Sequence, residues 1–122
     1  MESGNRVKPV RWVGASRREV QAFPARVRSE IGQALYAAQC GEVDPAAKPL
    51  KGFGGRNVTE IVTPFDGDTW RTVYTVRFED AIYVLHAFQK KSKSGVATPQ
   101  KEIDLIRKRL ADAGQDYKRR QN

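Results

Sequence analysis

Three β-rich segments joined by very short polar turns constrain the fold of this chain more than any other feature. They span residues 58–64, 69–78 and 81–89, and the turns between them are Asp66-Gly67-Asp68 and Glu79-Asp80. Connections this short join antiparallel neighbours, because parallel strands need a crossover of a dozen or more residues. We therefore predict an antiparallel three-stranded meander.

Alternating side chains give the segment 69–78 an apolar face and a cationic face. The apolar face, which we expect to pack in the core rather than to stack on RNA bases, consists of Trp70, Thr72, Tyr74, Val76 and Phe78. The other face carries Arg71 and Arg77. The segment 81–89 is apolar on both faces, which is typical of a central strand.

The residues before the meander predict a short strand and two helices. Residues 7–13 contain Pro9 and fit an edge strand. Ser16 and Glu19 match a capping box, so we expect a brief helix that begins at Ser16 and stops near Phe23. Apolar residues at helical spacing predict a second helix, from Pro24 to the glycine cap at residue 41.

After this helix, residues 42–57 are rich in proline and glycine and predict a loop. A third helix is expected to open at Thr98-Pro99 and to close near Gly114. The predicted order is β-α-α-β-β-β-α, an α+β fold in which a small antiparallel sheet is packed on one side by an N-terminal helical hairpin and a C-terminal helix. We expect one domain over residues 1–115 and a frayed basic tail over 116–122.

The charge balance points to an anionic partner. Among 122 residues there are 22 Lys and Arg and 14 Asp and Glu, which gives a formal net charge of +8. Such a surface favours RNA, DNA, an anionic membrane or an acidic protein. No apolar stretch approaches the roughly 20 residues that span a bilayer, and the single cysteine, Cys40, fits a reducing compartment. We expect a cytoplasmic protein without a membrane partner.

Cationic side chains dominate the candidate chemistry. The sequence contains no HExxH, GxSxG or Walker-type glycine loop, and His86 is its one histidine, so we expect neither a metal nor a cofactor. RNA cleavage needs no metal in principle, because the ribose 2′-OH can attack the neighbouring phosphorus if the protein moves protons and stabilises charge. The cations near the strands, which we expect to share a concave surface, are Lys51, Arg56, Arg71, Arg77, Lys90, Lys91 and Lys93.

Each of these residues also has a simpler interpretation. Arg71 can pair with a neighbouring carboxylate such as Glu60, and Lys90 and Lys91 can protect the end of an exposed strand. Lys51 can be a solvated residue of a glycine-rich loop. His86 is more typical of a buried, hydrogen-bonded histidine than of a catalytic one.

Several motifs resemble the RelE/HigB toxin superfamily, and most closely its phage-derived HigB-like branch. They are the strand WRTVYTV at residues 70–76, the run HAFQKKS at 86–92, the helix opening TPQKEI at 98–103, and the loop PLKGFG at 49–54. The similarity extends from about Lys8 to Leu110. HAFQKKS is the most specific part.

The resemblance implies a type II toxin that cleaves mRNA, often on the translating ribosome, and that a small helix-turn-helix antitoxin neutralises. It implies a phosphate-binding role for Arg71, catalytic roles for Lys90 and Lys91, and assistance from Lys51. We keep His86 among the catalytic candidates and expect Arg56, Arg77 and Lys93 to bind RNA. Tyr117 lies beyond a helix and is not equated with the terminal tyrosine of RelE, so the general acid and base stay open.

Two other functions remain open at this point. ParE relatives share the fold and poison gyrase without cleaving RNA, and a degenerate toxin would only bind its antitoxin or nucleic acid.

Overall fold

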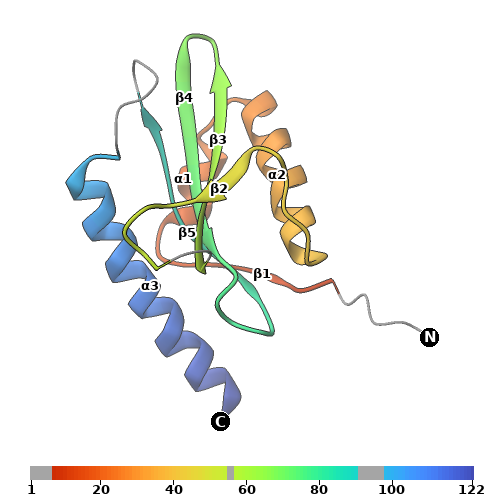
Figure 1. The fold of residues 1–122 in the computed structure, drawn as a ribbon, viewed down its shortest axis with the longest axis vertical. Helices are drawn as coiled ribbons and strands as arrows, with labels where there is room; N and C mark the ends of the chain where they lie inside the picture. The colour runs from red at the N-terminus through yellow and green to blue at the C-terminus, as the bar shows by residue number, and fades with distance from the viewer. Residues whose placement is uncertain (1–6, 55–56, 91–97) are drawn as a thin grey trace.

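The computed structural model describes residues 7–54, 57–90 and 98–122, which form five strands and three helices (Figure 1). In chain order the elements are β1 (Val10–Trp12), α1 (Ser16–Gln21), α2 (Ala25–Gln39), β2 (Ala47–Pro49), β3 (Val58–Phe65), β4 (Asp68–Thr75), β5 (Ile82–Lys90) and α3 (Gln100–Gln121). The α+β class and the meander β3-β4-β5 are confirmed. None of the helices among these residues has the length and apolar character needed to cross a membrane.

The sheet has the order β1-β5-β4-β3-β2, so β5 is an interior strand between β1 and β4, as its two apolar faces predict. Its β2 strand was not expected, because it lies inside the Pro- and Gly-rich segment 42–57. It pairs antiparallel with β3, whereas β1 pairs parallel with β5. The expectation of a purely antiparallel sheet is therefore wrong at its β1 edge.

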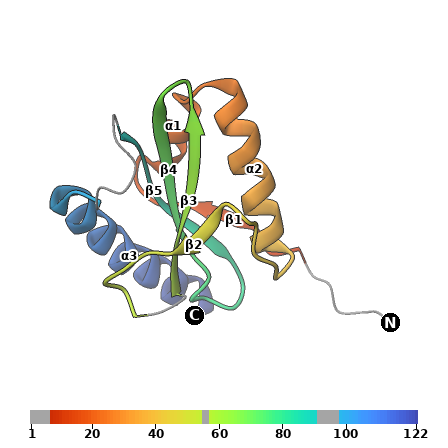
Figure 2. The same cartoon turned by 45° about the horizontal axis from the view of Figure 1, so that its top comes forward.

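Helices cover both faces of the sheet, not one face as expected (Figure 2). On one face, α1 and α2 bury residues such as Val20, Val27 and Ile31 against Ile61 and Tyr74. On the other face, α3 packs over a second core that consists of Val58, Val73, Tyr83, Leu85, Phe88, Ile106, Ala113 and their neighbours. An apolar strand such as β5 stabilises both layers at once, because its two faces contribute to separate cores.

A bulge in β5 changes which side chains share a face. Val73 pairs with His86 but the next residue, Tyr74, pairs with Val84, so Leu85 has no partner in β4. Such an extra residue reverses the alternation of the strand beyond it. Simple alternation would place Phe88 on the same face as Ile82 and Val84, but Ile82 and Val84 belong to the α2-side core and Phe88 to the α3-side core.

Three local predictions about element ends are wrong. Ser16 does not cap α1: its Oγ accepts a hydrogen bond from the Val13 amide, and Glu19 turns into the interior instead of back to the helix start. The β4 strand ends at Thr75, so Val76 and Phe78 do not continue its face. Helix α3 runs past the expected cap at Gly114.

The reason for the longer helix lies in its last turns. Tyr117 packs against Phe78, with 4.9 Å between ring centroids, and its hydroxyl donates to Asp80. Asp116 accepts hydrogen bonds from Tyr83, Arg119 and Arg120. These contacts hold residues 116–121 in the helix rather than in a frayed tail.

Candidate functional site

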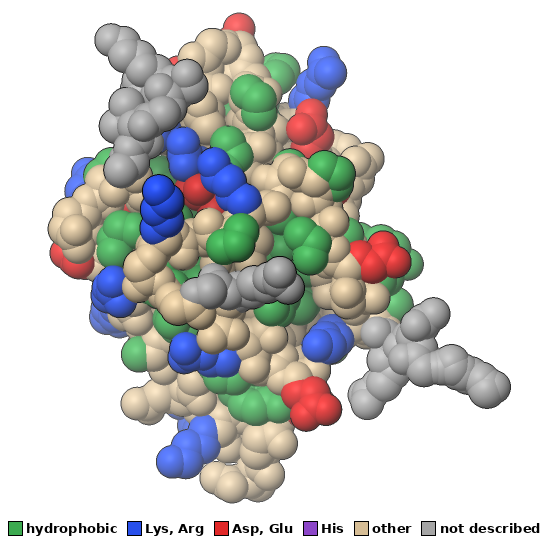
Figure 3. All heavy atoms as spheres, viewed as in Figure 1, with side chains coloured by type: hydrophobic (Ala, Val, Ile, Leu, Met, Phe, Trp, Pro, Cys, Tyr) green, Lys and Arg blue, Asp and Glu red, His purple; other side chains and the backbone are tan. Residues whose placement is uncertain are grey.

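A cleft of about 570 Å³ lies between the edge of the sheet and the first turns of α3. We call it the cationic cleft, because four of its lining side chains are positive. Its charged lining residues are Lys48, Lys51, Glu60, Arg71 and Arg107. Figure 3 shows Lys and Arg side chains gathered on the face of the molecule that carries it. Glu60 is the one carboxylate among the described lining residues, so the cleft has a strong positive surplus.

Arg71 and Glu60 lie on neighbouring strands and form an ion pair across them. In the register of β3 and β4, Glu60 faces Val73 and Arg71 faces Val62, so the two charged residues are diagonal neighbours on the same face. Arg71 Nη1 donates to Glu60 Oε1 over 3.0 Å, with the side chains only 11% and 3% exposed. The carboxylate thus fixes one edge of the guanidinium in the wall of the cleft.

The rest of the Arg71 guanidinium keeps hydrogen-bonding capacity. Its Nε is buried and has no hydrogen-bond partner within the described residues. A guanidinium has five N–H donors and can bind two oxygens of one phosphate at once. The pair with Glu60 uses one N–H of Nη1, so Arg71 can bind an anion in the cleft through other donors of its guanidinium while it stays paired.

Lys90 lies on the same face as Arg71, at the end of β5. Lys90 is opposite Thr69 and Phe88 is opposite Arg71, so Lys90 and Arg71 are close diagonal neighbours. The residue is buried. Burial lowers the pKa of Lys90 and the positive charge of Arg71 lowers it further, while Glu60 opposes the shift. A lysine with a lowered pKa releases its proton more readily than an exposed one.

Helix α3 contributes to the cleft through its beginning and its second turn. Pro99, not Thr98, is the residue that precedes α3, and no side chain caps the helix. The Thr98 hydroxyl instead points to Glu60, 3.5 Å from Oε2. Arg107 donates to the carbonyl of Gly52 and places its guanidinium 4.6 Å from the centroid of the Phe53 ring. Neither Thr98 as a cleft residue nor Arg107 was predicted from the sequence.

The predicted cations occupy different places. Lys51 lines the cationic cleft with Arg71. Arg77 is exposed and lines a separate hollow of about 330 Å³ on the other side of Arg107. Arg56, Lys91 and Lys93 lie outside the described residues.

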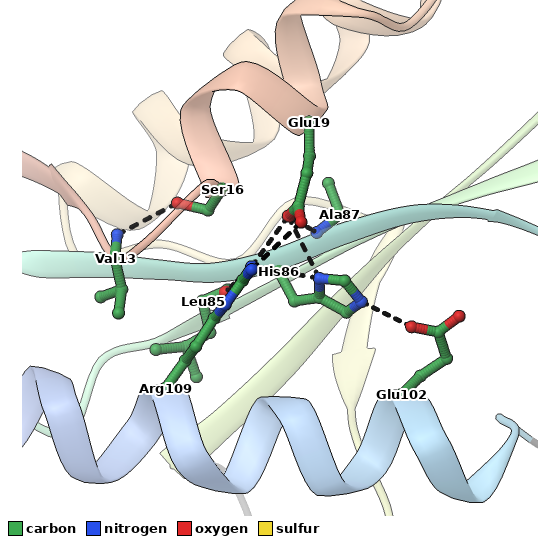
Figure 4. A network of polar contacts seen from close by, with 8 residues as sticks. All are labelled: Val13, Ser16, Glu19, Leu85, His86, Ala87, Glu102 and Arg109. Carbon is green, nitrogen blue, oxygen red and sulfur yellow. Dashed lines mark hydrogen bonds and ion pairs between the residues drawn. The ribbon is translucent and has the colours of Figure 1, made fainter.

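His86 lies in a buried polar network between α1, β5 and α3, drawn in Figure 4. Its Nδ1 is 3.1 Å from Glu19 Oε1 and its Nε2 is 2.6 Å from Glu102 Oε1. Arg109 Nη1 donates to the same Glu19 oxygen over 2.9 Å and to the Leu85 carbonyl over 3.0 Å. We call these four side chains, Glu19, His86, Glu102 and Arg109, the interior network.

The interior network is electrically balanced when its histidine is protonated, with two carboxylates facing two cations. Burial alone would raise the pKa of Glu19, but hydrogen bonds from His86, Arg109 and the Ala87 amide lower it to about 2. Burial alone would lower the pKa of His86, but hydrogen bonds and negative charge from Glu19 and Glu102 raise it. Glu19 and His86 therefore each favour the charged form of the other.

His86 does not line the cationic cleft, and it is only 4% exposed. Its two carboxylate partners come from the helices on opposite faces of the sheet. This arrangement fits the buried, hydrogen-bonded histidine that the sequence favoured. We propose that His86 acts by positioning α3 beside the cleft, and not on the substrate.

Within the described part of the chain, no three His, Cys, Asp or Glu side chains form a group that could hold a metal ion. The polar groups that do converge are the cations of the cleft. An arrangement of this kind, with one carboxylate among several Lys and Arg, is suited to bind a phosphate backbone.

The fold and the site together define a class of small α+β proteins with a cationic cleft beside the sheet. The family model described as Phage derived protein Gp49-like (DUF891) matches residues 18–111. The chain therefore belongs to this family, a family of RelE-like toxins, and the predicted relationship to phage-derived RelE-type toxins is confirmed.

None of the curated proteins matches the chain. Among solved structures, one similar chain comes from the toxin–antitoxin complex RelBE2 of Mycobacterium tuberculosis. It is 16% identical, covers 75% of this chain and 100% of its own length, and has a TM-score of 0.48.

Proposed function

We propose that this RelE-type toxin is an endoribonuclease that cleaves mRNA in the cationic cleft without a metal ion. The observation that carries the proposal is the Arg71–Glu60 pair, which joins an anion-binding group to a carboxylate in one wall of a cleft. Both groups are almost fully buried, so their positions are fixed before any substrate binds. Preorganised charge of this kind is a major source of rate acceleration.

The proposed reaction is a transfer of the phosphorus from the 5′ oxygen of one nucleotide to the 2′ oxygen of its neighbour. Glu60 accepts the proton of the 2′-OH while that oxygen attacks the phosphorus. Arg71 binds the non-bridging oxygens, and Lys51 adds positive charge. The bond to the 5′ oxygen breaks, and Lys90 supplies the proton that this oxygen takes up. The products are a 2′,3′-cyclic phosphate and a 5′-OH.

Inducible expression in bacteria, followed by primer extension on a translated message, tests this proposal. Arg71→Ala is expected to abolish growth arrest and to lower cleavage by about 10²–10³-fold or more, because one stabilising donor group is lost. The matched control is Arg26→Ala. That arginine pairs loosely with Glu30 on the exposed face of α2, and its side chain is 75% exposed. If Arg71→Ala is as toxic as the parent protein, the proposal fails.

We propose in addition that the natural substrate is mRNA on the translating ribosome and that an antitoxin neutralises the protein. The net charge of +8 supports attraction to ribosomal RNA and to an acidic segment of a partner. Cleavage of the same message, naked and during translation, measures ribosome dependence. Co-expression of a neighbouring helix-turn-helix reading frame should restore growth.

If the protein acts on gyrase instead, the purified protein should inhibit DNA supercoiling and leave RNA intact. These two results together would contradict the nuclease proposal. None of the described residues of the cleft favours an action on gyrase over RNA cleavage.

A further inference from the structure

Arg107 separates two neighbouring hollows on the α3 side of the molecule. It lines the cationic cleft together with Lys51 and Arg71, and it also lines the second hollow together with Arg77. Phe53 lies in the wall of the second hollow, one residue after Gly52 in the wall of the first. The two hollows therefore meet at the Arg107 side chain.

The second hollow carries positive charge, which suits the negatively charged backbone of a nucleic acid. Its lining residues are Phe53, Arg77, Phe78, Arg107, Leu110, Ala111 and Gly114. These include two arginines, and no Asp or Glu is present among the described lining residues. Arg77 is exposed, and its hydrogen bond to Thr75 Oγ1 comes from the backbone amide and leaves the guanidinium out. Its guanidinium is therefore available to an external anion.

Arg107 has the geometry of a stacking platform. Its guanidinium lies 4.6 Å from the centroid of the Phe53 ring, and Nη2 donates to the Gly52 carbonyl over 3.2 Å. The aromatic ring is buried beneath it, while Arg107 itself is exposed. An arginine held in this way presents its outer face to solvent, and unstacked RNA bases stack on guanidinium planes.

We propose that single-stranded RNA bound in the cationic cleft continues across Arg107 into the second hollow, where Arg77 holds the phosphate of a flanking nucleotide. This subsite rests on the proposed function, since it extends the same substrate beyond the scissile phosphate. Arg77 and Arg107 are then binding residues, and they contribute to affinity rather than to the chemical step.

The test uses the purified full chain and RNA oligonucleotides whose 2′-hydroxyls are methylated, so that they bind without being cleaved. One series is extended only on the 5′ side of the preferred cleavage site, and another only on the 3′ side. Binding is measured by fluorescence anisotropy over a range of salt concentrations. Arg77→Ala is expected to weaken binding to one of the two extended series and to leave the short oligonucleotide unaffected. The slope of log affinity against log salt should fall by about 0.7, the value for one phosphate contact on a single strand.

A second variant, Arg107→Lys, keeps the charge but removes the guanidinium plane. Loss of stacking is expected to weaken binding of the extended oligonucleotide by about 5- to 150-fold, with little change in the salt slope. The control is Arg26→Ala, which removes an arginine far from both hollows. On cleavable RNA, Arg77→Ala, which lies outside the cationic cleft, should raise KM and leave kcat close to that of the parent.

Two results separate this inference from the proposed function. If the parent protein cleaves RNA but Arg77→Ala weakens long and short oligonucleotides equally, or weakens neither, the subsite is overturned and the nuclease proposal stands. If the parent protein neither binds nor cleaves RNA, both proposals fall.

Discussion

Arg71 on β4 and Glu60 on β3 form a nearly buried ion pair, 3.0 Å between Nη1 and Oε1, in the wall of the cationic cleft. The pair has two consequences. It holds the guanidinium at a fixed place, and it keeps a carboxylate beside the position where a phosphate would bind. The sequence pattern raised this pairing as an alternative to phosphate binding, but the two roles are compatible, because the pair with Glu60 uses only one of the five N–H donors of the guanidinium.

Glu60→Gln separates the proton-accepting role of Glu60 from its structural role. Glutamine keeps the shape and can still accept a hydrogen bond from Arg71, but it is a very weak base. We expect cleavage to fall by about 10²–10⁴-fold, as is typical when a general base is lost. Affinity for 2′-O-methylated RNA should be equal or higher, because a negative charge leaves the cleft.

Single-turnover cleavage and anisotropy measure these two effects separately. The free energy of unfolding, measured with urea, is expected to fall by about 1.5–3 kcal/mol because the hydrogen bond loses its charged acceptor. Cleavage by Glu60→Gln at the parental rate would rule out Glu60 as the base.

The interior network predicts that the free energy of unfolding declines on both the alkaline and the acid side of its pH dependence. The pKa of His86 is raised in the folded protein, so its contribution is complete below its usual pKa of 6.5 and is lost as the pH rises through the folded value. The pKa of Glu19 is lowered from 4.5 to about 2, so its contribution is complete above 4.5 and is lost as the pH falls toward 2.

Urea denaturation at a series of pH values measures both limbs. In His86→Gln the decline of stability above pH 6.5 should disappear, and in Glu19→Gln the acid limb should shrink. Each variant is expected to lose about 1.5–3 kcal/mol near pH 6, because hydrogen bonds to charged groups are lost. A parallel decline in the parent and in His86→Gln would show that His86 does not carry the alkaline limb.

Local sequence patterns predicted those parts of the fold that depend on residues close together in the sequence. Period-two alternation and short turns were enough for β3, β4 and β5. The three-residue strand β2 has no such period, since Ala47–Pro49 is too short to alternate visibly and lies among prolines and glycines. The parallel pairing of β1 with β5 joins residues such as Val10 and Ile82, and no local pattern encodes such a distant contact.

The same distinction applies to the candidate site. Arg71 and Lys90 stand out in the sequence because they lie within or just after predicted strands, and Lys51 stands out in a glycine-rich loop. Arg107 lies on the polar side of an amphipathic helix, where arginine is common, and only its place over Phe53 gives it a role. Glu19 matched a capping box, but in the structure its carboxylate contacts His86, which is 67 residues away in the sequence. Bonds over such distances arise from tertiary packing, which the pattern of a single segment does not contain.

Replacing glycine by alanine should have opposite effects on stability inside a helix and in a turn. Gly114 lies inside α3, and a Cβ there would meet Phe78 Cζ at 3.7 Å, an ordinary contact. Gly114→Ala should therefore raise the free energy of unfolding by about 0.5–1 kcal/mol, and Gly32→Ala, in open space on α2, should do the same. Gly14→Ala is the contrasting variant. Gly14 has a φ of +55°, and a Cβ there would lie 3.2 Å from Arg109 Nε.

We expect Gly14→Ala to lose about 1–2 kcal/mol or more, because a left-handed backbone is strained by a side chain and Arg109 must also move. Thermal and urea unfolding of the three variants measure these differences. A stabilised Gly14→Ala, or a destabilised Gly114→Ala, would contradict the packing described around α3.

Lys90 provides the test of the proposed general acid. A lysine that donates a proton must hold that proton in the free enzyme, so cleavage should decline as the pH rises through its pKa, which burial and Arg71 place below the usual 10.5. Lys90→Arg keeps the positive charge, but a guanidinium, whose pKa is far higher than that of a lysine ammonium, donates its proton poorly. We expect kcat to fall by about 10²–10⁴-fold with little change in KM. In the parent, kcat should decline as the pH rises through the pKa of Lys90. In Lys90→Arg, kcat should show no decline over the same pH range. The control is Lys48→Arg, in which an exposed lysine that lines the cationic cleft is exchanged in the same way and kcat is expected to stay near that of the parent. If Lys90→Arg retains both the rate and the pH profile of the parent, Lys90 stabilises charge and another group protonates the 5′ oxygen.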